Sequence, residues 1–348
     1  MAAGSIFSSI SDALVKPALI KLQERLYLLQ FRIMKIVPAK FIIERALQLG
    51  RLRPGDLVLE SSSGTFALGL GIVCSENDLR FAIYTDPVIE ADLRSHLELL
   101  GGEVFVSTRA APSGGYQKAR LDALMERLQS DKSAYWTRQY SNPDNANAYG
   151  ALVNDLPKEL GGSLTIVGTV GSGGSTFGII DRLRRGIPSA KLVGVDTFNS
   201  VLFGQTDGHR LLRGLGNSVL PENVRHAAYD DVHWVSAEAA FIATRRLLKE
   251  HAIYAGPTTG AAYLAAKWHV RMHPEETVVT IGPDEGHRYA RSVYDNDWMI
   301  ANGFNPNAEP PEHPALAAHP SLADGKWAWF PWGRRDYSEL YPVPRMPS

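Results

Sequence analysis

The chain has 348 residues, 45% of them hydrophobic, and a formal net charge of −1. This length and composition indicate a globular protein with a substantial core and favour two domains. A nearly neutral chain without a Lys/Arg tract lacks the basic field that attracts nucleic acid or an anionic membrane, so neither is expected as a partner. The single cysteine, Cys74, excludes an intrachain disulfide and a multi-cysteine metal site, and no metal is expected.

The N-terminal residues 1–25 are predicted to form a short arm. Asp12 and Lys16 interrupt its mildly apolar start before a signal-peptide core develops, and no run approaches the length of a membrane span, so we expect a cytoplasmic protein. A strand is expected over residues 25–33. A helix over residues 41–50 would then place Lys40 at its start, where a solvated surface charge is the simplest interpretation of the residue alone.

A strand over residues 56–60 runs directly into a polar turn, and an apolar helix over residues 66–73 follows. Such a turn presents hydroxyl and N–H groups to a carboxylate, although a plain helix cap explains it equally well. The candidate substrate ligands in this turn are Ser61, Ser62, Ser63, Gly64 and Thr65.

Strands and helices then alternate along the chain, a pattern typical of βαβ units and a parallel sheet. The first set comprises strands 80–85 and 103–107 and helices 89–100 and 116–129. The second set comprises strands 191–195, 232–235 and 277–281 and helices 237–251 and 260–272. Two successive α/β layers agree with two domains. From residue 305 onward the chain is rich in Pro and aromatic residues, and we expect it to wrap over the surface or over a partner subunit.

A glycine-rich turn joins the strand at residues 164–167 to a helix over residues 176–183. Its glycines permit close approach of a ligand and positive φ, and successive N–H groups at a helix start favour an anion. No lysine follows the glycines, so the turn is not a P-loop, and it departs from the dinucleotide fingerprint. A cup for a monoester phosphate is one interpretation, and a turn without a ligand is the other. The candidate ligands are Gly171, Ser172, Gly173, Gly174 and Ser175.

In order and spacing, these motifs resemble those of the fold-type II pyridoxal-phosphate enzymes, the cysteine synthase family, over roughly residues 15–303. The segments that carry the resemblance are 38–46 around Lys40, 60–65, 171–175, 256–260, 283–289 and 294–298. Within the family, segments 60–64, 114–116 and 135–143 are most similar to the N-(2-amino-2-carboxyethyl)-L-glutamate synthases of diaminopropionate and siderophore pathways.

The resemblance implies an α/β fold of two domains, each a mostly parallel twisted sheet flanked by helices, with pyridoxal 5′-phosphate in the cleft between them. A large cofactor-phosphate-binding domain would comprise residues 12–33 and 148–302, and a smaller mobile domain that binds the substrate carboxylate would comprise residues 34–147. Residues 303–348 would form an extension. A homodimer is also expected.

By the same resemblance, Lys40 would carry the cofactor as a Schiff base, which requires an amine that can lose its proton. Residues 171–175 would bind the cofactor phosphate, and Thr258 would face the pyridine nitrogen. Thr65 stands where the family has an asparagine that bonds the 3′-oxygen, so that oxygen would be less well held. Gln139 and Tyr140 would contact the substrate.

The implied reaction is a β-replacement on an activated serine, either O-phosphoserine or O-acetylserine. The freed lysine would remove the α-proton, loss of the β-substituent would leave an aminoacrylate, and a nucleophile would add to it. Arg120 is a candidate ligand for a leaving phosphate because its guanidinium matches a phosphate fork, although a solvated helix charge is the alternative. We therefore expect O-phosphoserine to be preferred.

Several alternatives stay open from the sequence. The nucleophile, whether sulfide, glutamate, ammonia or a larger amine, is not identified, so the product is a diaminopropionate precursor, another non-protein amino acid or cysteine. A β-eliminating lyase of the serine dehydratase type, or a racemase, would use the same cofactor without a second substrate. A non-catalytic binding partner that kept the fold is a further alternative.

Overall fold

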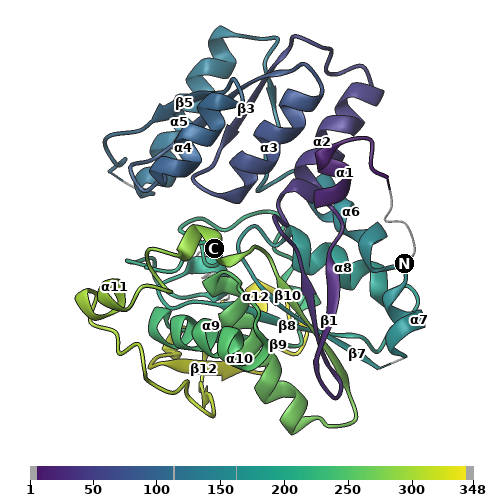
Figure 1. Ribbon diagram of the computed structural model, residues 1–348, viewed down its shortest axis with the longest axis vertical. Helices are drawn as coiled ribbons and strands as arrows, with labels where there is room; N and C mark the ends of the chain where they lie inside the picture. Colours follow the sequence, from purple (N-terminus) through teal and green to yellow (C-terminus); the bar gives the residue numbers. More distant parts are fainter. Residues whose placement is uncertain (1–5, 113, 162, 342–348) are drawn as a thin grey trace, which may run out of the picture. The chain divides into compact units, whose positions relative to one another are not determined.

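The computed structural model describes residues 6–112, 114–161 and 163–341, which divide into two units (Figure 1). The first unit comprises the chain up to Pro17 together with Phe31–Tyr149, and the second comprises Ala18–Gln30 together with the chain from Gly150 onward. Residues 1–5 and 342–348, the outer ends of the two predicted terminal segments, lie outside the described residues.

The first unit is built on a four-stranded parallel sheet with the strand order β5-β4-β3-β6. Its strands are β3 (Leu57–Ser61), β4 (Arg80–Thr85), β5 (Glu103–Val106) and β6 (Tyr135–Trp136). Its helices are α1 (Ile10–Leu14), α2 (Ile36–Gln48), α3 (Thr65–Glu76), α4 (Ala91–Leu99) and α5 (Gly115–Ser130), and α6 (Asp144–Gly150) ends the unit. Because β3 and most of α3 are buried, the turn between them is held firmly at the carboxyl edge of the sheet.

The second unit is built on an eight-stranded sheet with the strand order β1-β2-β10-β7-β8-β9-β12-β11. Its inner strands β2 (Leu26–Gln30), β7 (Leu164–Thr169), β8 (Lys191–Asp196), β9 (Asp231–Val235) and β10 (Thr277–Gly282) run parallel. The strand β1 (Ala18–Gln23) pairs antiparallel with β2 at one end of the sheet. The fully buried β7 and β10 form the centre of this unit's core.

The helices of the second unit pack on this sheet. Helices α9 (Ala237–His251) and α10 (Pro257–Met272) lie against each other, and α10 also contacts β10 and β7, whereas α8 (Gly174–Arg184) contacts β7 and β8 (Figure 1). The short helices α7 (Leu156–Leu160) and α11 (Asn296–Ala301) and several 3₁₀ turns complete the unit. These observations confirm the predicted α/β class with largely parallel sheets.

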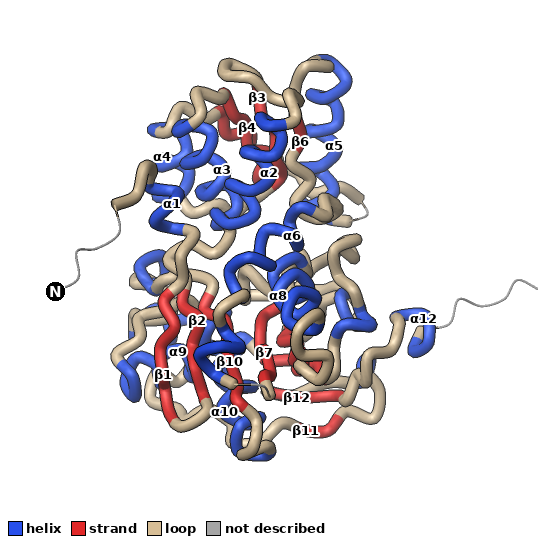
Figure 2. The backbone as a smooth tube through the Cα atoms, turned by 90° about the vertical axis from the view of Figure 1, so that its right-hand side faces the viewer, coloured by secondary structure: helices blue, strands red, loops and turns tan. Residues whose placement is uncertain are grey.

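The C-terminal extension adds two strands and a helix that were not predicted from the sequence. Strand β12 (Trp327–Phe330) pairs antiparallel with β9, β11 (Ala315–Leu316) pairs with β12, and α12 (Tyr337–Leu340) follows (Figure 2). The extension therefore covers the edge of its own sheet. Its strands are short and flanked by Pro and Gly, so no period-2 pattern develops from which to predict them.

Two expectations about the N-terminal region were wrong. The segment 18–30 forms the hairpin β1–β2 rather than an arm followed by one strand. Residues 12–17, expected in the larger domain, belong to the first unit because the backbone N–H of Ser11 donates to Glu76 at 2.9 Å and Lys40 bonds the Ser11 hydroxyl.

None of the helices in the described part of the chain combines the length and apolar character that crossing a membrane requires.

The contact between α9 and α10 yields a stability prediction. A Cβ at Gly260 would lie 2.0 Å from the Thr244 hydroxyl and 2.6 Å from the Ala240 carbonyl, whereas one at Gly186 would meet nothing closer than 3.8 Å. We expect Gly260→Ala to lower the free energy of unfolding of the second unit by about 2 kcal/mol through overpacking. The matched control Gly186→Ala should change it by less than about 0.5 kcal/mol. Urea unfolding of both variants measures this, and equal values would contradict the close helix contact.

Candidate active site

The turn between β3 and α3 lies at the carboxyl edge of the first unit's sheet. Its backbone is tied to the next strand, because the N–H of Ser62 donates to the Tyr84 carbonyl at 3.1 Å. The Ser62 hydroxyl accepts a hydrogen bond from the Gly64 N–H at 3.3 Å. The buried Ser61 hydroxyl has no hydrogen-bond partner among the described residues. Together with the N–H groups of the first turn of a helix, this hydroxyl makes the turn suited to an anion such as a carboxylate.

A buried carboxylate, Glu60, organises the backbone beneath this turn. It accepts hydrogen bonds from the Ser61 N–H at 2.6 Å, the Thr137 hydroxyl at 2.5 Å and the Gln139 N–H at 3.0 Å. Burial raises the pKa of Glu60, and these hydrogen bonds counteract part of the shift. Gln139 in turn donates its side-chain amide to the Ser61 carbonyl at 2.8 Å. Gln139 thus fixes the turn, and the organising roles of Glu60 and Thr137 were not predicted from the sequence.

Arg120 is buried rather than solvated, which excludes its interpretation as an exposed helix charge. It forms an ion pair with Asp86 at 2.9 Å, and each side chain is 7% exposed. The Nε of Arg120 has no hydrogen-bond partner among the described residues. Tyr140 lies within electrostatic range of this pair: burial raises the pKa of its phenol, while the Arg120 charge lowers it and Asp86 raises it. The arrangement offers one unused guanidinium N–H close to a tyrosine.

Lys40 is not at the start of its helix, contrary to expectation. Helix α2 begins at Ile36, so Lys40 lies in its second turn. The ammonium forms ion pairs with Asp12 at 3.0 Å and Glu44 at 2.8 Å. Although burial opposes the shift, hydrogen bonds with Glu44 and Asp12 raise the pKa of Lys40. A lysine held in its charged form in this way attaches α1 to α2 and is poorly suited to act as a nucleophile or base.

Lys35, immediately before α2, has a pKa shifted in the opposite direction. It occupies the N-cap position of the helix. The residue keeps some exposed surface, but its ammonium is desolvated, which lowers its pKa from 10.5 to about 8. A substantial neutral fraction therefore exists near neutral pH. Pro38 is the signal that could have identified it, because proline is tolerated in the first turn of a helix and so indicates a start near Ile36.

A close backbone contact joins the residues at the start of α2 to α3. A Cβ at Gly69 would lie 2.8 Å from the Ile36 Cα and 3.2 Å from the Lys35 carbonyl carbon. Gly69 is one helical turn after Thr65, the first residue of α3, so both lie on the same side of that helix. Lys40 is five residues further along α2, roughly 140° around the helix from Lys35. Within the first unit, the backbone of Lys35 and Ile36 therefore lies against the second turn of α3.

The glycine-rich turn of the second unit has the predicted positive φ at Gly173 but not at Gly171 or Gly174. Gly173 precedes α8 with φ of 82° in the left-handed region, and a Cβ there would lie 2.7 Å from the Asn223 carbonyl. A Cβ at Gly171 would lie 3.0 Å from the Gly214 carbonyl. Ser172 and Ser175 are buried. Position 173 therefore requires glycine and position 171 leaves little room for a side chain, and Gly174 starts an eleven-residue helix whose first N–H groups face the turn.

Thr258 stands in the first turn of α10 in the same unit, after the N-cap residue Gly256. Its buried hydroxyl has no hydrogen-bond partner among the described residues, and neither has that of Thr259. Folded proteins pair nearly all of their buried hydroxyls, so these two groups are suited to hydrogen-bond a ligand.

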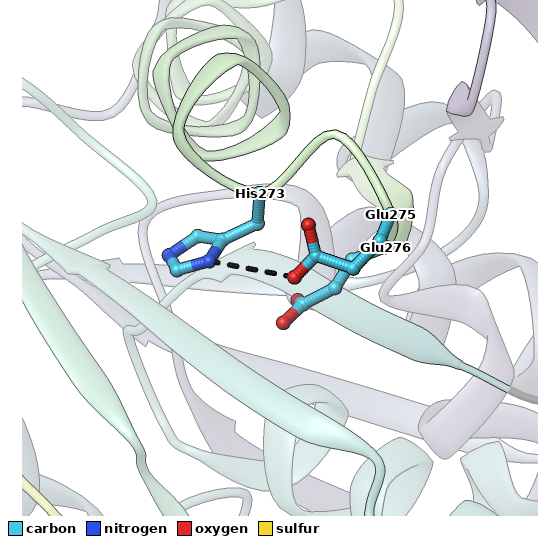
Figure 3. A group of neighbouring side chains, drawn as sticks. All are labelled: His273, Glu275 and Glu276. Atoms are coloured by element: carbon cyan, nitrogen blue, oxygen red, sulfur yellow. Dashed lines mark ion pairs between the residues drawn. The ribbon is translucent and has the colours of Figure 1, made fainter.

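One cluster in the described chain has metal-ligand residue types, namely His273, Glu275 and Glu276 (Figure 3). Glu276 is already engaged by Lys191, by the Thr165 hydroxyl and by His269, whose Nε2 lies 3.0 Å away. Although burial opposes the shift, hydrogen bonds with His269, Lys191 and Thr165 lower the pKa of Glu276. The cluster is explained by this structural ion-pair network, and we assign no metal to it.

Comparison with known proteins identifies the family to which these motifs correspond. The family model described as "Pyridoxal-phosphate dependent enzyme" matches residues 25–284. The N-(2-amino-2-carboxyethyl)-L-glutamate synthase of Ralstonia nicotianae is 37% identical over 270 residues, which are 75% of this chain and 78% of that protein. The synthase of the same name from Cupriavidus metallidurans is 34% identical over 292 residues, 82% of this chain and 84% of that protein.

Among solved structures, the chain is similar to the O-acetylserine dependent cystathionine β-synthase from Helicobacter pylori, with a TM-score of 0.76 and 23% identity. That match covers 83% of this chain and 99% of the other. The likeness concerns the fold. The C-terminal extension lies outside the family match, which ends at residue 284.

The lowered pKa of Lys35 predicts a pH-dependent stability difference in the ligand-free protein. Between pH 8 and 10.5 the unfolded chain binds a proton at Lys35 that the folded chain does not, so this group makes stability rise with pH in that window. Lys35→Met should therefore be more stable than the wild type at pH 7, by at most about 3 kcal/mol, and the gain should vanish as pH approaches 10.5. The residual exposure of the side chain reduces this value.

Urea unfolding at pH 7 and pH 9.5 measures the difference, with Lys40→Met as the control. That variant should be less stable than the wild type at pH 7 because it leaves Asp12 and Glu44 without their cation. A Lys35→Met gain that stays constant between the two pH values would show that the Lys35 ammonium is not desolvated.

Proposed function

The chain belongs to the family of pyridoxal-phosphate-dependent enzymes, and from this premise we propose that it catalyses β-replacement on an activated L-serine, with O-phosphoserine as the preferred substrate and an amino acid as nucleophile. The product is then an N-substituted 2,3-diaminopropionate, as in the name of the synthases from Ralstonia and Cupriavidus. The observation that carries the proposal is the desolvated Lys35 ammonium, on a segment whose backbone packs against α3 at Gly69.

The residues of the second unit fit the cofactor. In the turn 171–175, the space that a Cβ would occupy at Gly171 and Gly173 is taken by neighbouring backbone, so the chain there is closely packed. The turn leads into the N-terminus of α8, whose free N–H groups suit a monoester phosphate. The unpartnered Thr258 hydroxyl suits an uncharged ring nitrogen, to which it would donate a hydrogen bond. When bound, pyridoxal phosphate supplies the electron sink for negative charge at the substrate Cα.

Lys35, rather than Lys40, is the amine that carries the cofactor and moves the α-proton. A lysine whose pKa is about 8 is partly neutral at physiological pH, and it can both give up and take up a proton there. Lys40 is held as a cation by Asp12 and Glu44, and its role is to attach α1 to α2. Lys35 therefore replaces Lys40 as the proposed Schiff-base lysine.

Residues 61–65 hold the substrate carboxylate. The unpartnered Ser61 hydroxyl and the N-terminus of α3 provide the hydrogen-bond donors, and Gln139 keeps the Ser61 carbonyl turned away through its own amide. Ser62, Ser63 and Gly64 supply further hydroxyl and backbone N–H groups, and Thr65 offers a hydroxyl to the cofactor's 3′-oxygen. Glu60 holds the turn in place from beneath.

Arg120 recognises the leaving phosphate, and Asp86 and Tyr140 form its surroundings. In the reaction the Cβ–O bond of O-phosphoserine breaks, the electron pair leaves with the phosphate, and the amino group of the nucleophile forms the new Cβ–N bond and loses a proton. A guanidinium with an unused N–H is a suitable partner for the departing dianion.

The proposal also places the protein in a reducing, cytoplasmic setting, because its only cysteine is a buried free thiol. A homodimer is expected on the grounds of the family resemblance.

Product analysis tests the proposed reaction. Purified protein with pyridoxal phosphate, O-phosphoserine and L-glutamate should release inorganic phosphate and an equal amount of a product with the mass of N-(2-amino-2-carboxyethyl)-L-glutamate. Lys35→Ala should lower kcat at least a thousandfold because the transferring amine is lost, whereas Lys40→Ala should keep kcat within roughly tenfold. Release of pyruvate without the amino-acid product would identify a lyase, and loss of activity only in Lys40→Ala would overturn the role of Lys35.

A second test concerns selection of the serine derivative. Arg120→Ala should lower kcat/KM for O-phosphoserine by roughly ten- to a hundredfold, because it removes a charged hydrogen bond worth about 1.5 to 3 kcal/mol. Turnover of O-acetylserine, which carries less charge, should change far less. Lys118→Ala is the matched control, since Lys118 lies on the same helix but is exposed and pairs with Asp122.

Asp86→Asn gives the complementary test. It leaves Arg120 as an uncompensated buried cation, so inorganic phosphate should bind more tightly and inhibit at lower concentration than in the wild type. Equal losses with both serine derivatives in Arg120→Ala, together with unchanged phosphate inhibition in Asp86→Asn, would mean that the pair is only structural.

A further inference from the structure

The C-terminal extension packs against the segment that forms the wall of the glycine-rich turn. The geometry points to a positioning role: residues 332–341 hold segment 199–229, and this segment holds the turn 171–176 in the conformation that binds the cofactor phosphate. The inference rests on the proposed function, because that function assigns the turn to the cofactor. All residues concerned belong to the second unit, and the extension lies beyond residue 284, where the family match ends.

The first layer of contacts is aromatic. Trp332, which is fully buried, has its ring centroid 5.1 Å from that of Phe203 and 5.5 Å from that of His226. Phe203 also makes an edge contact with Tyr229 at 5.1 Å. The side chain of Trp332 therefore joins the extension to an aromatic cluster in segment 199–229, in which Phe203 also contacts His226 and Tyr229. The large ring of a buried Trp supplies much of the packing around such a cluster.

Backbone hydrogen bonds reinforce this cluster. The N–H of Gly333 donates to the Asp230 carbonyl at 2.7 Å, and that of Arg334 donates to the Tyr229 carbonyl at 2.8 Å. Further along, the Tyr341 hydroxyl donates to the Phe203 carbonyl at 3.2 Å. Gly204 is packed against the Tyr341 ring so closely that a Cβ would lie 1.9 Å from it. The extension is thus fastened to the segment at both ends of residues 332–341.

The second layer joins this segment to the glycine-rich turn. The N–H of Gly216 donates to the Val170 carbonyl at 2.8 Å, and the Asn217 side-chain amide donates to the Gly171 carbonyl at 3.4 Å. The Asn223 carbonyl is the atom that a Cβ at Gly173 would meet at 2.7 Å. The segment therefore contacts residues 170, 171 and 173, and a shift of its backbone would move the turn.

A shorter route runs through Tyr229. Its hydroxyl is 2.8 Å from the Thr176 hydroxyl, and Thr176 donates to the Gly173 carbonyl at 3.1 Å. Both side chains are fully buried. Because the Tyr229 carbonyl also accepts the Arg334 N–H, a single residue connects the extension to the left-handed position of the turn. Buried hydrogen-bonded networks of this kind rigidify the groups they join.

Edge protection alone would not require these contacts. Strand β12 covers the open edge of β9 through residues 327–330, whereas the contacts described above come from residues that follow the strand. The two roles are separable by mutation: Trp329, on β12, contacts Trp268 and His233 instead of segment 199–229.

The experiment compares Trp332→Leu with the matched control Trp329→Leu. For each full-length protein, the Kd for pyridoxal phosphate, the Tm of the ligand-free form and the hydrogen exchange of peptides covering residues 171–176 are measured. Trp332→Leu should raise the Kd by roughly five- to twentyfold and accelerate exchange in the turn, whereas Trp329→Leu should keep the Kd within roughly twofold even where its Tm falls equally. A Trp332→Leu protein with lowered Tm, unchanged Kd and unchanged exchange would overturn the inference.

Tyr341→Phe provides a second variant that removes only one hydroxyl and keeps the ring. It should accelerate exchange of peptides covering residues 201–204 and raise the Kd by roughly two- to threefold, and no change in either quantity would contradict the inference. Failure of the wild-type protein to bind pyridoxal phosphate would overturn the proposed function instead. In that case the exchange of residues 171–176 in the ligand-free variants still decides whether the extension holds the turn.

Discussion

The candidate site of the first unit depends on one backbone contact, the approach of the start of α2 to Gly69 of α3. Because Gly69 has no side chain, the backbone of Lys35 and Ile36 packs directly against the second turn of α3. The Lys35 ammonium is desolvated. Desolvation then lowers the pKa of the lysine to about 8, which is what a neutral amine near physiological pH requires. The proposed role of the turn 61–65 and of the helix N-terminus beside it, which is to bind the substrate carboxylate, depends on this lysine acting as the amine. Any side chain at position 69 would clash with the backbone of Ile36 and force the two helices to shift.

Two buried carboxylates, Glu60 and Asp86, position the other polar groups of this candidate site. Glu60 accepts three close hydrogen bonds under the turn and so determines where its backbone lies, while Asp86 neutralises the otherwise unpaired cation of Arg120. Burial makes both groups costly to disturb, since a lone charge left in either place would lack compensation. The same charges in exposed positions, such as Lys118 with Asp122, contribute little. Burial rather than residue type therefore distinguishes these ions from the surface ions of the same unit.

The sequence predicted the elements whose pattern is local. Alternating strands and helices, the turn 61–65 and the glycines at 171–174 follow from hydrophobic periodicity and from the conformational freedom of glycine. What it did not predict depends on contacts between distant residues. The expectation that Lys40 stands at the start of a helix was wrong because the helix begins at Ile36, five residues before the assigned start, as Pro38 indicated. The ion pairs of Lys40 with Asp12 and the packing of Trp332 on Phe203 join segments 28 and 129 positions apart, and no local pattern reports them.

The central claim is that Lys35 carries the cofactor. Borohydride reduction of the protein loaded with pyridoxal phosphate, followed by proteolysis and mass spectrometry of the peptides, tests it most directly, because reduction fixes the cofactor to whichever lysine holds it. A cleavage site after Lys35 is lost when that residue is modified, so its peptide is readily told apart from one modified at Lys40. We expect the pyridoxyl group on Lys35, with Lys40 unmodified. A pyridoxyl group on Lys40, with Lys35 unmodified, would contradict the claim.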